Sequence, residues 1–144
     1  MREYRGILLL LTSLLSLPLL GAVYATGCTP SSLTQMCIAT DKTDYAPGAT
    51  VSITVEMTGD DLQLTNLPTY PIIMSPISGN QASSSVVAST NVTINYVGGM
   101  VWEGSVSLVV PGTAPAGNYD LMVLYHPDGN SGAAVGGSVE LTVT

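Results

Sequence analysis

The sequence predicts an all-β protein, folded as an antiparallel β-sandwich of about seven strands behind an N-terminal hydrophobic segment. Three observations lead to this expectation. Apolar and polar residues alternate along several short stretches, so each stretch has one face suited to burial. Turn-forming Gly, Pro, Asn and Asp residues recur between these stretches. No window after residue 25 repeats its apolar residues with the 3.6-residue period of a helix.

The first 25 residues have the features of an export signal. Arg2 and Arg5 precede an apolar run from Ile7 to Ala22, and the run closes on Val23-Tyr24-Ala25, with small residues where a signal peptidase requires them. We therefore expect a hydrophobic signal helix over residues 1–25 that is cleaved after Ala25. The protein is then secreted and works outside the cell, at the cell surface.

Two alternatives to simple cleavage stay open. The apolar segment approaches the roughly 20 residues that a membrane-spanning helix needs, so a retained anchor is the first. The second is a lipoprotein, in which Cys28 of Ala25-Thr26-Gly27-Cys28 carries the lipid. By length the processed chain is a single domain, with an N-terminal segment over 26–40 and the sandwich over 41–144.

The processed chain is strongly acidic and nearly free of basic side chains. Both arginines leave with residues 1–25, so nine acidic residues face Lys42 alone and the formal charge is −8. Nucleic acid and anionic membranes repel such a chain. We therefore expect protein partners or self-association at the cell surface, no nucleic acid, and membrane contact only through the N-terminal segment.

The two cysteines are expected to pair. Cys28 and Cys37 both follow the signal, and an exported chain meets an oxidising environment. Their disulfide would close a short loop and stabilise the fold by roughly 2–3 kcal/mol. Two free thiols are the alternative. Two cysteines and the distant His126 do not supply the four ligands of a structural zinc site, so no metal or cofactor is predicted.

The expected strands follow one another along the chain. The clearest covers residues 49–58, where Val51, Ile53, Val55 and Met57 share one face. Four others alternate similarly, over residues 91–96, 102–110, 119–126 and 139–144. A less regular strand over 69–77 contains two prolines, which cannot donate to a ladder, so we expect it at a sheet edge or bulged. The serine-rich stretch 83–89 is either a strand edge or a loop.

Two motifs sit beside the predicted strands. In Tyr45-Ala-Pro47-Gly48-Ala-Thr-Val51, the Pro-Gly pair sets a tight turn ahead of a long strand. In Pro115-Ala-Gly117-Asn-Tyr119-Asp-Leu121-Met-Val123, Gly117 lets the backbone enter the sheet. Tyr119 is placed to hydrogen-bond back across the corner.

Together these motifs resemble those of immunoglobulin-like sandwich domains of secreted surface proteins, especially the macroglobulin-type module. The resemblance covers residues 36–144 and implies an immunoglobulin-like fold. It gives Tyr45, Pro47, Gly48, Gly117 and Tyr119 structural roles at turns and corners. It implies no particular ligand, because the module occurs in adhesins, protease inhibitors, filament subunits and spacers. The Cys…Trp…Cys pattern of antibody domains is absent, since Trp102 follows both cysteines and is expected to pack in the core.

A further resemblance concerns assembly. Short exported sandwich proteins with few charges and an N-terminal extension are similar to filament subunits that join by strand exchange. In those subunits the N-terminal segment of one completes the sheet of the next. The candidate donor here is residues 26–40, with Met36 and Ile38 as its strong apolar pair.

Other candidate chemistry is sparse. His126 lies beside Pro127 on an expected outward face, where we predict a solvated side chain. Asp60-Asp61 could ligate calcium together with backbone carbonyls, although adjacent acids in turns are usually solvated. One histidine without a positioned acid does not form a triad with the serines of 83–85, so we predict no enzyme. Asn91-Val92-Thr93 is an N-glycosylation sequon with Asn91 expected to point outward.

The sequence therefore predicts an exported, non-enzymatic cell-surface module, structural or binding, with an immunoglobulin-like fold. Two alternatives remain: a subunit of an extracellular filament assembled by donor-strand exchange, and a binding protein tethered by a lipid or a helix.

Overall fold

The computed structural model describes residues 25–29, 34–59, 69–125 and 134–144, and the structural statements below concern these residues. They form eleven strands and no helix, which confirms the all-β class. The predicted signal helix, apart from Ala25, lies outside the described residues. So do Asp60-Asp61 and His126.

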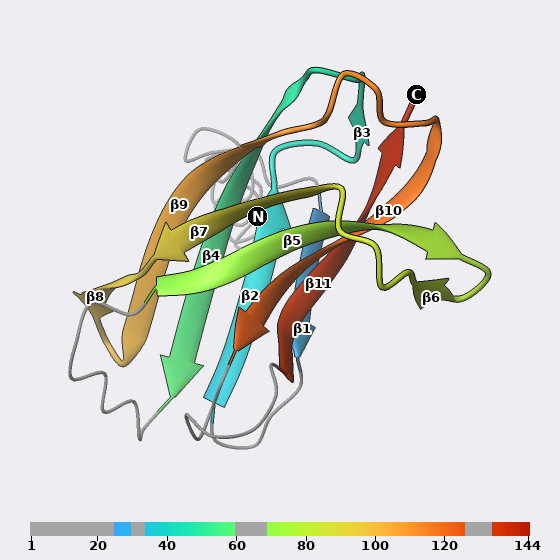
Figure 1. Ribbon diagram of the computed structural model, residues 1–144. Coiled ribbons are helices and arrows are strands. Elements are labelled where there is room, and N and C mark those ends of the chain that lie inside the picture. The colour runs from blue at the N-terminus through green and yellow to red at the C-terminus, as the bar shows by residue number, and fades with distance from the viewer. Residues whose placement is uncertain (1–24, 30–33, 60–68, 126–133) are drawn as a thin grey trace, which may run out of the picture.

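The strands form two sheets that face each other (Figure 1). Sheet 1 has the order β1 (Ala25–Thr29), β2 (Thr34–Thr40), β4 (Thr50–Gly59), β9 (Val101–Val109) and β8 (Asn95–Gly98). Sheet 2 has the order β3 (Asp44–Tyr45), β11 (Ala134–Val143), β10 (Gly117–Tyr125), β5 (Thr69–Ser78) and β6 (Gln81–Ala82). In sheet 2, β5 also pairs with β7 (Ala88–Thr93).

Almost every pairing is antiparallel, as the sequence predicts. The exception among the described strands is the short β3, which runs parallel to β11 and places Tyr45 opposite Val143. Seven strands have six or more residues, and these are the strands that carry the sandwich: β2, β4, β5, β7, β9, β10 and β11.

The apolar faces of the two sheets meet in one core. On β4 the predicted alternation holds, with Val51, Ile53, Val55 and Met57 each at most 1% exposed. Opposed residues of an antiparallel pair share a face, so their β9 partners Leu108, Val106, Gly104 and Trp102 also face inward. Buried side chains from sheet 2 complete the core: Tyr70, Ile72, Met74, Val92, Tyr119, Leu121, Val123, Val139, Leu141 and Val143.

Three glycines stand where the backbones of the two sheets approach each other. A Cβ at Gly27 of β1 would overlap the carbonyl oxygen of Ser138 on β11. A Cβ at Gly137 would lie 2.8 Å from the Gly27 carbonyl oxygen. Farther along the sandwich, a Cβ at Gly104 of β9 would overlap the carbonyl oxygen of Thr93 on β7. Only glycine permits these approaches, because any other residue places a carbon where the neighbouring backbone lies.

The proline-containing strand is neither an edge strand nor bulged in its pairing with β10 and β7, so that expectation is wrong. β5 lies inside sheet 2, between β10 and β7. Each proline nevertheless avoids a two-sided ladder. Pro71 lies beyond the last β10 partner of β5, and Pro76 lies beyond the last β7 partner. The missing N–H of each proline can therefore face the side where the ladder has ended.

The single strand expected over residues 91–96 is also wrong. β7 ends at Thr93 in sheet 2, and β8 begins at Asn95 in sheet 1. The chain therefore changes sheets at Ile94, whose side chain is fully buried. Tyr96, expected on the buried face with Val92 and Ile94, is instead 58% exposed at the sheet edge. The apolar and polar residues do alternate over 91–96, but the alternation runs through Ile94, which links two different sheets.

Candidate functional site

The Tyr45 motif builds a hydrogen-bonded corner beside β3. The Tyr45 hydroxyl donates to Asp41 Oδ1 at 2.7 Å and accepts from the Lys42 amide at 2.9 Å. The Ser52 amide also donates to Asp41 Oδ1, at 3.0 Å. Burial opposes ionisation of Asp41, but these hydrogen bonds outweigh it and hold the pKa of Asp41 below its ordinary 3.8. Burial and the nearby Asp41 carboxylate raise the pKa of Tyr45 to about 12.

The Pro47-Gly48 pair forms a closed turn. The Ala49 amide donates to the Ala46 carbonyl at 3.0 Å, and Gly48 has a φ of +83°, which favours glycine. The Gly48 amide also donates to the Val110 carbonyl at 2.8 Å. The turn is therefore tied to the residue that follows β9.

The second motif forms a corner at the start of β10. The Tyr119 hydroxyl donates to the Pro115 carbonyl at 2.7 Å, and the tyrosine is only 3% exposed. Gly117 opens the strand with a φ of +152°. The hydroxyls of Tyr45 and Tyr119 and the amide of Gly48 thus bond to backbone groups or to Asp41, and these bonds shape the chain.

The Cys28–Cys37 disulfide is present, as predicted. It joins directly opposed residues of β1 and β2. Cys37 also pairs with the outward-facing Glu56, so the disulfide lies on the outward face of sheet 1, where Cys28 is exposed. Residues 26–40, expected as an N-terminal segment with a disulfide loop, thus contribute to two strands of the sheet, β1 and β2. A sulfur bonded to Cys37 leaves Cys28 no thiol to carry a lipid.

Asn91 lies exposed on β7. In the same sequon, the Thr93 hydroxyl lies 2.9 Å from the Thr69 hydroxyl of β5. The sequon thus occupies the outward face of sheet 2, on a different strand from the Tyr45 and Tyr119 corners. The structure does not bring the predicted residues together into one site.

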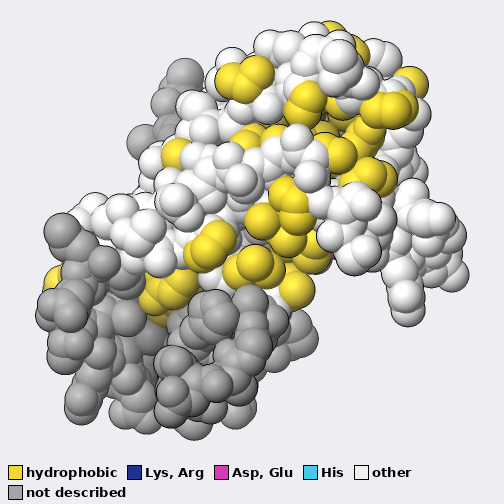
Figure 2. All heavy atoms as spheres, viewed as in Figure 1, with side chains coloured by type: hydrophobic (Ala, Val, Ile, Leu, Met, Phe, Trp, Pro, Cys, Tyr) yellow, Lys and Arg dark blue, Asp and Glu magenta, His cyan; other side chains and the backbone are white. Residues whose placement is uncertain are grey.

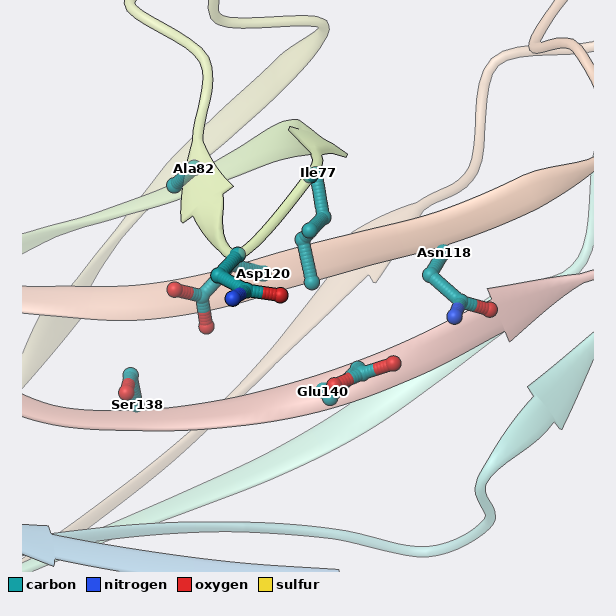
Figure 3. Close-up of a pocket in the computed structure, with 8 residues that line it drawn as sticks. Ile77, Ala82, Asn118, Asp120, Ser138 and Glu140 are labelled. Atoms are coloured by element: carbon teal, nitrogen blue, oxygen red, sulfur yellow. The ribbon is translucent and has the colours of Figure 1, made fainter.

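A polar pocket of about 530 Å³ lies where the β5–β6 turn overhangs β10 and β11 (Figure 3). Its carboxylates are Asp120 and Glu140, which are directly opposed across β10 and β11. Burial, and next the charge of Glu140, raises the pKa of Asp120 above its ordinary 3.8. Like charges in opposed positions destabilise a sheet, so the Asp120–Glu140 pair lowers the stability of the folded state. The other lining residues are Ile77, Gly79, Asn80, Ala82, Asn118 and Ser138.

The second candidate is the open edge, which we define as β7 and β9 together with the segment 83–87 that leads into β7. Five partly exposed hydrophobic residues pack against the core, and four belong to this edge: Val87, Ala88, Trp102 and Val106. Val86 beside them is 50% exposed. Beyond this edge, Tyr96 of β8 packs against Trp102 with ring centroids 5.2 Å apart and ring planes tilted by 52°.

Figure 2 shows that hydrophobic side chains reach the surface on the face where β5 and β7 lie in front. Among the described residues visible there, no acidic or basic side chain appears. The absence of charge on β5 and β7 follows from the sequence, because no charged residue occurs between Asp61 and Glu103. This long uncharged run is the sequence signal for the uncharged face. The pairing of Asp120 with Glu140 could not be predicted from the sequence, because it depends on the register of β10 and β11.

Comparison with protein-family models, with curated proteins and with solved structures finds no match for this chain. Among the described residues, no group of three His, Cys, Asp or Glu side chains is close enough to hold a metal ion. The described part of the chain also includes no helix with the length and apolar character to cross a membrane. Two surface features of the described residues thus remain as candidate sites, the pocket and the open edge.

Proposed function

We propose that the protein is an exported, non-enzymatic module of the cell surface that acts through protein–protein contacts. The observation that carries this proposal is the open edge: its apolar side chains are partly exposed, one side of β7 is paired by no described strand, and no charged side chain is visible on the face shown in Figure 2. Exposed apolar surface of this kind is typical of interaction sites. The processed chain, with a formal charge of −8, makes contact most readily where it presents none of that charge.

We also propose that the sandwich is immunoglobulin-like. Its support is the set of seven strands of six or more residues in two facing sheets. A second support is the hydrogen bond from Tyr119 to the Pro115 carbonyl at the start of the penultimate strand, the position of a tyrosine corner. The resemblance of the two motifs supports the same assignment.

The disulfide supports export, because stable disulfides form mainly outside the reducing cytosol. An N-linked glycan at the exposed Asn91 is part of the proposal, in a host that glycosylates exported proteins. Lipidation at Cys28 is disfavoured, because a thioether and the disulfide need the same sulfur.

The filament alternative receives no support from the position of its donor. Residues 26–40 include β1 and β2, which are linked by the disulfide and paired with each other and with β4. Donation of this segment to another subunit would open sheet 1 of its own chain. We therefore favour a module that keeps its N-terminal strands.

The test is recovery of the protein from its producing cells. We expect mass spectrometry to find a chain that begins at Thr26 with the disulfide intact. We expect proteinase K to degrade the protein on intact cells, whereas trypsin has only Lys42 to cut in the processed chain. A cytosolic protein that starts at Met1 and has free thiols would overturn the proposal.

A further inference from the structure

The polar pocket beneath the β5–β6 turn contains two carboxylates that no described basic side chain neutralises. Asp120 of β10 and Glu140 of β11 are directly opposed, and both lie on the outer face of sheet 2. Lys42 is the one lysine or arginine in the described part of the chain, and it does not line the pocket. The pocket therefore concentrates negative charge and favours a cation.

Neutral oxygen atoms lie around the two carboxylates. Asn118 precedes Asp120 by two residues on β10, so the two side chains share one face of the sheet. Ser138 precedes Glu140 in the same way on β11. Figure 3 shows these four side chains on β10 and β11, and Asn80 of the overhanging turn lines the pocket with them. Carboxylate, amide and hydroxyl oxygens are the ligands that hard cations take.

A buried hydroxyl beside the pocket lacks a hydrogen-bond partner. Ser75 of β5 is directly opposed to Asp120, so its side chain points to the same outer face of sheet 2. The serine is 1% exposed, and its Oγ has no hydrogen-bond partner among the described residues. A buried hydroxyl without a partner lowers stability unless a bound group completes its bonding. The row of Ser75, Asp120 and Glu140 across three neighbouring strands thus contains one unpaired hydroxyl and two unneutralised charges.

A second acid pair shows what distinguishes this one. Glu56 and Glu103 are directly opposed across β4 and β9, and both are exposed. Water screens the repulsion between exposed charges. Asp120 is partly buried beside the β5–β6 turn, where screening is weaker. A bound cation would relieve the repulsion at the Asp120 pair far more than at the Glu56 pair.

We propose that the pocket binds a calcium ion between the carboxylates of Asp120 and Glu140. Neutral oxygens and water complete its shell, so the site needs no third acidic ligand, and the Ser75 hydroxyl bonds to that shell. The neutral side chains are those of Asn80, Asn118 and Ser138. Calcium suits such a mixed set, because it accepts about six to eight oxygens in flexible geometry, whereas magnesium demands a near-ideal octahedron. The site shares no residue with the open edge.

The test is calorimetric titration of calcium chloride into purified protein that has been freed of metal with a chelator. We expect one ion per chain with a dissociation constant of about 10⁻⁴ to 10⁻³ M, the range of extracellular modules. Asp120→Asn should weaken binding by at least about tenfold, because it removes one of two charged ligands. Glu103→Gln is the matched control. It removes the same charge from the exposed acid pair and should change affinity by less than about twofold.

Thermal unfolding gives a second measurement. Calcium should raise the unfolding temperature of the unaltered protein and of Glu103→Gln, but not that of Asp120→Asn. In chelator, Asp120→Asn should be at least as stable as the unaltered protein, because the repulsion is relieved. Its loss of calcium binding would therefore not be due to misfolding. Ser75→Ala should weaken calcium binding several-fold without lowering stability in chelator, since it removes an unpartnered hydroxyl.

Three results would overturn the calcium site. The first is no saturable binding up to about 10 mM calcium, ten times the upper end of the expected range. The second is binding that survives Asp120→Asn, which would place the ion elsewhere on the chain. The third is an equal loss of affinity in Glu103→Gln, which would mean that net charge alone attracts the ion. Unchanged affinity in Ser75→Ala would overturn the role given to that hydroxyl. A protein that binds no calcium but is recovered from the cell surface would leave the proposed function standing.

Discussion

The two long edges of the sandwich are built differently. At one edge, β1 and β2 lie on β11, with Gly27 and Gly137 allowing backbone contact between the sheets. The core residues there, Met36, Ile38 and Val139, are at most 7% exposed. At the open edge, β7 and β9 touch where Gly104 meets Thr93, and hydrophobic side chains beyond that contact remain partly exposed.

The two edges therefore divide the work of stability and of interaction between them. The closed edge excludes water from the core and carries the disulfide that holds β1 to β2. The open edge leaves apolar surface and strand groups available to a partner. Substitutions at the closed edge should therefore act mainly on stability, whereas those on β7 should act mainly on association.

The largest expected effect is at Gly27. Gly27→Val places a branched side chain where the Ser138 carbonyl lies, so β1 must leave β11, and we expect a loss of about 3 kcal/mol or more in unfolding free energy. Urea denaturation measures it. Gly112→Ala is the control, since a Cβ there meets nothing within 4 Å, and it should change stability by less than about 0.5 kcal/mol. If the two variants are equally stable, then close packing of β1 on β11 does not stabilise the closed edge.

Removal of the disulfide should rank second. Replacing both Cys28 and Cys37 by Ser removes the cross-link that restricts the unfolded chain. We expect the unfolding free energy to fall by roughly 2–3 kcal/mol. Thermal unfolding of the oxidised protein, the reduced protein and the double variant measures it. The reduced protein and the variant should agree. If reduction leaves the unfolding temperature unchanged, the closed edge depends on packing alone.

Gly104→Ala tests the contact at the open edge. The added methyl group meets the Thr93 carbonyl, but β7 is an edge strand and can shift away from β9. We therefore expect a smaller loss than at Gly27, about 1–2 kcal/mol. Hydrogen exchange should rise in β7 more than in β11. Uniformly raised exchange would mean that both edges are equally coupled to the core.

Tyr45→Phe should cost about 1–2 kcal/mol at neutral pH, because the Asp41 carboxylate and the Lys42 amide lose their partner. The lowered pKa of Asp41 contributes stability above pH 3.8, which is lost as pH falls through the folded-state pKa. The variant should show less of this acid-induced loss. Denaturation from pH 7 to 2 measures it. Tyr119→Phe, which removes a bond to a backbone carbonyl, should leave the pH dependence unchanged.

The smallest effect is expected at the acid pair. Asp120→Asn removes the charge opposed to Glu140, and we expect a gain of a few tenths of a kcal/mol at pH 7. Because the pKa of Asp120 is raised, its stabilising contribution is complete below pH 3.8 and is lost as pH rises through the folded-state pKa. The gain should vanish near pH 3. A gain that persists there would assign the effect to packing.

Much of the fold was predictable, because it depends on local patterns. The alternation of Val51, Ile53, Val55 and Met57 predicted both the strand and its buried face. The cysteine pairing was predictable because the chain offers only two cysteines. The interior position of β5 could not be predicted from its prolines, because a sheet tolerates a proline wherever the neighbouring strand has already ended. The candidate sites were harder still, since Asp120 and Glu140 meet only through strand register.

The all-β class, the apolar faces of the main strands and the pairing of the cysteines could all be predicted from the amino-acid sequence, because alternation and composition are properties of short stretches of chain. Tertiary structure decided which strands became edges, where Ile94 carried the chain from one sheet to the other, and which glycines met a facing backbone. The physical reason is that strand neighbours and sheet contacts join residues far apart in sequence, where no local period records them.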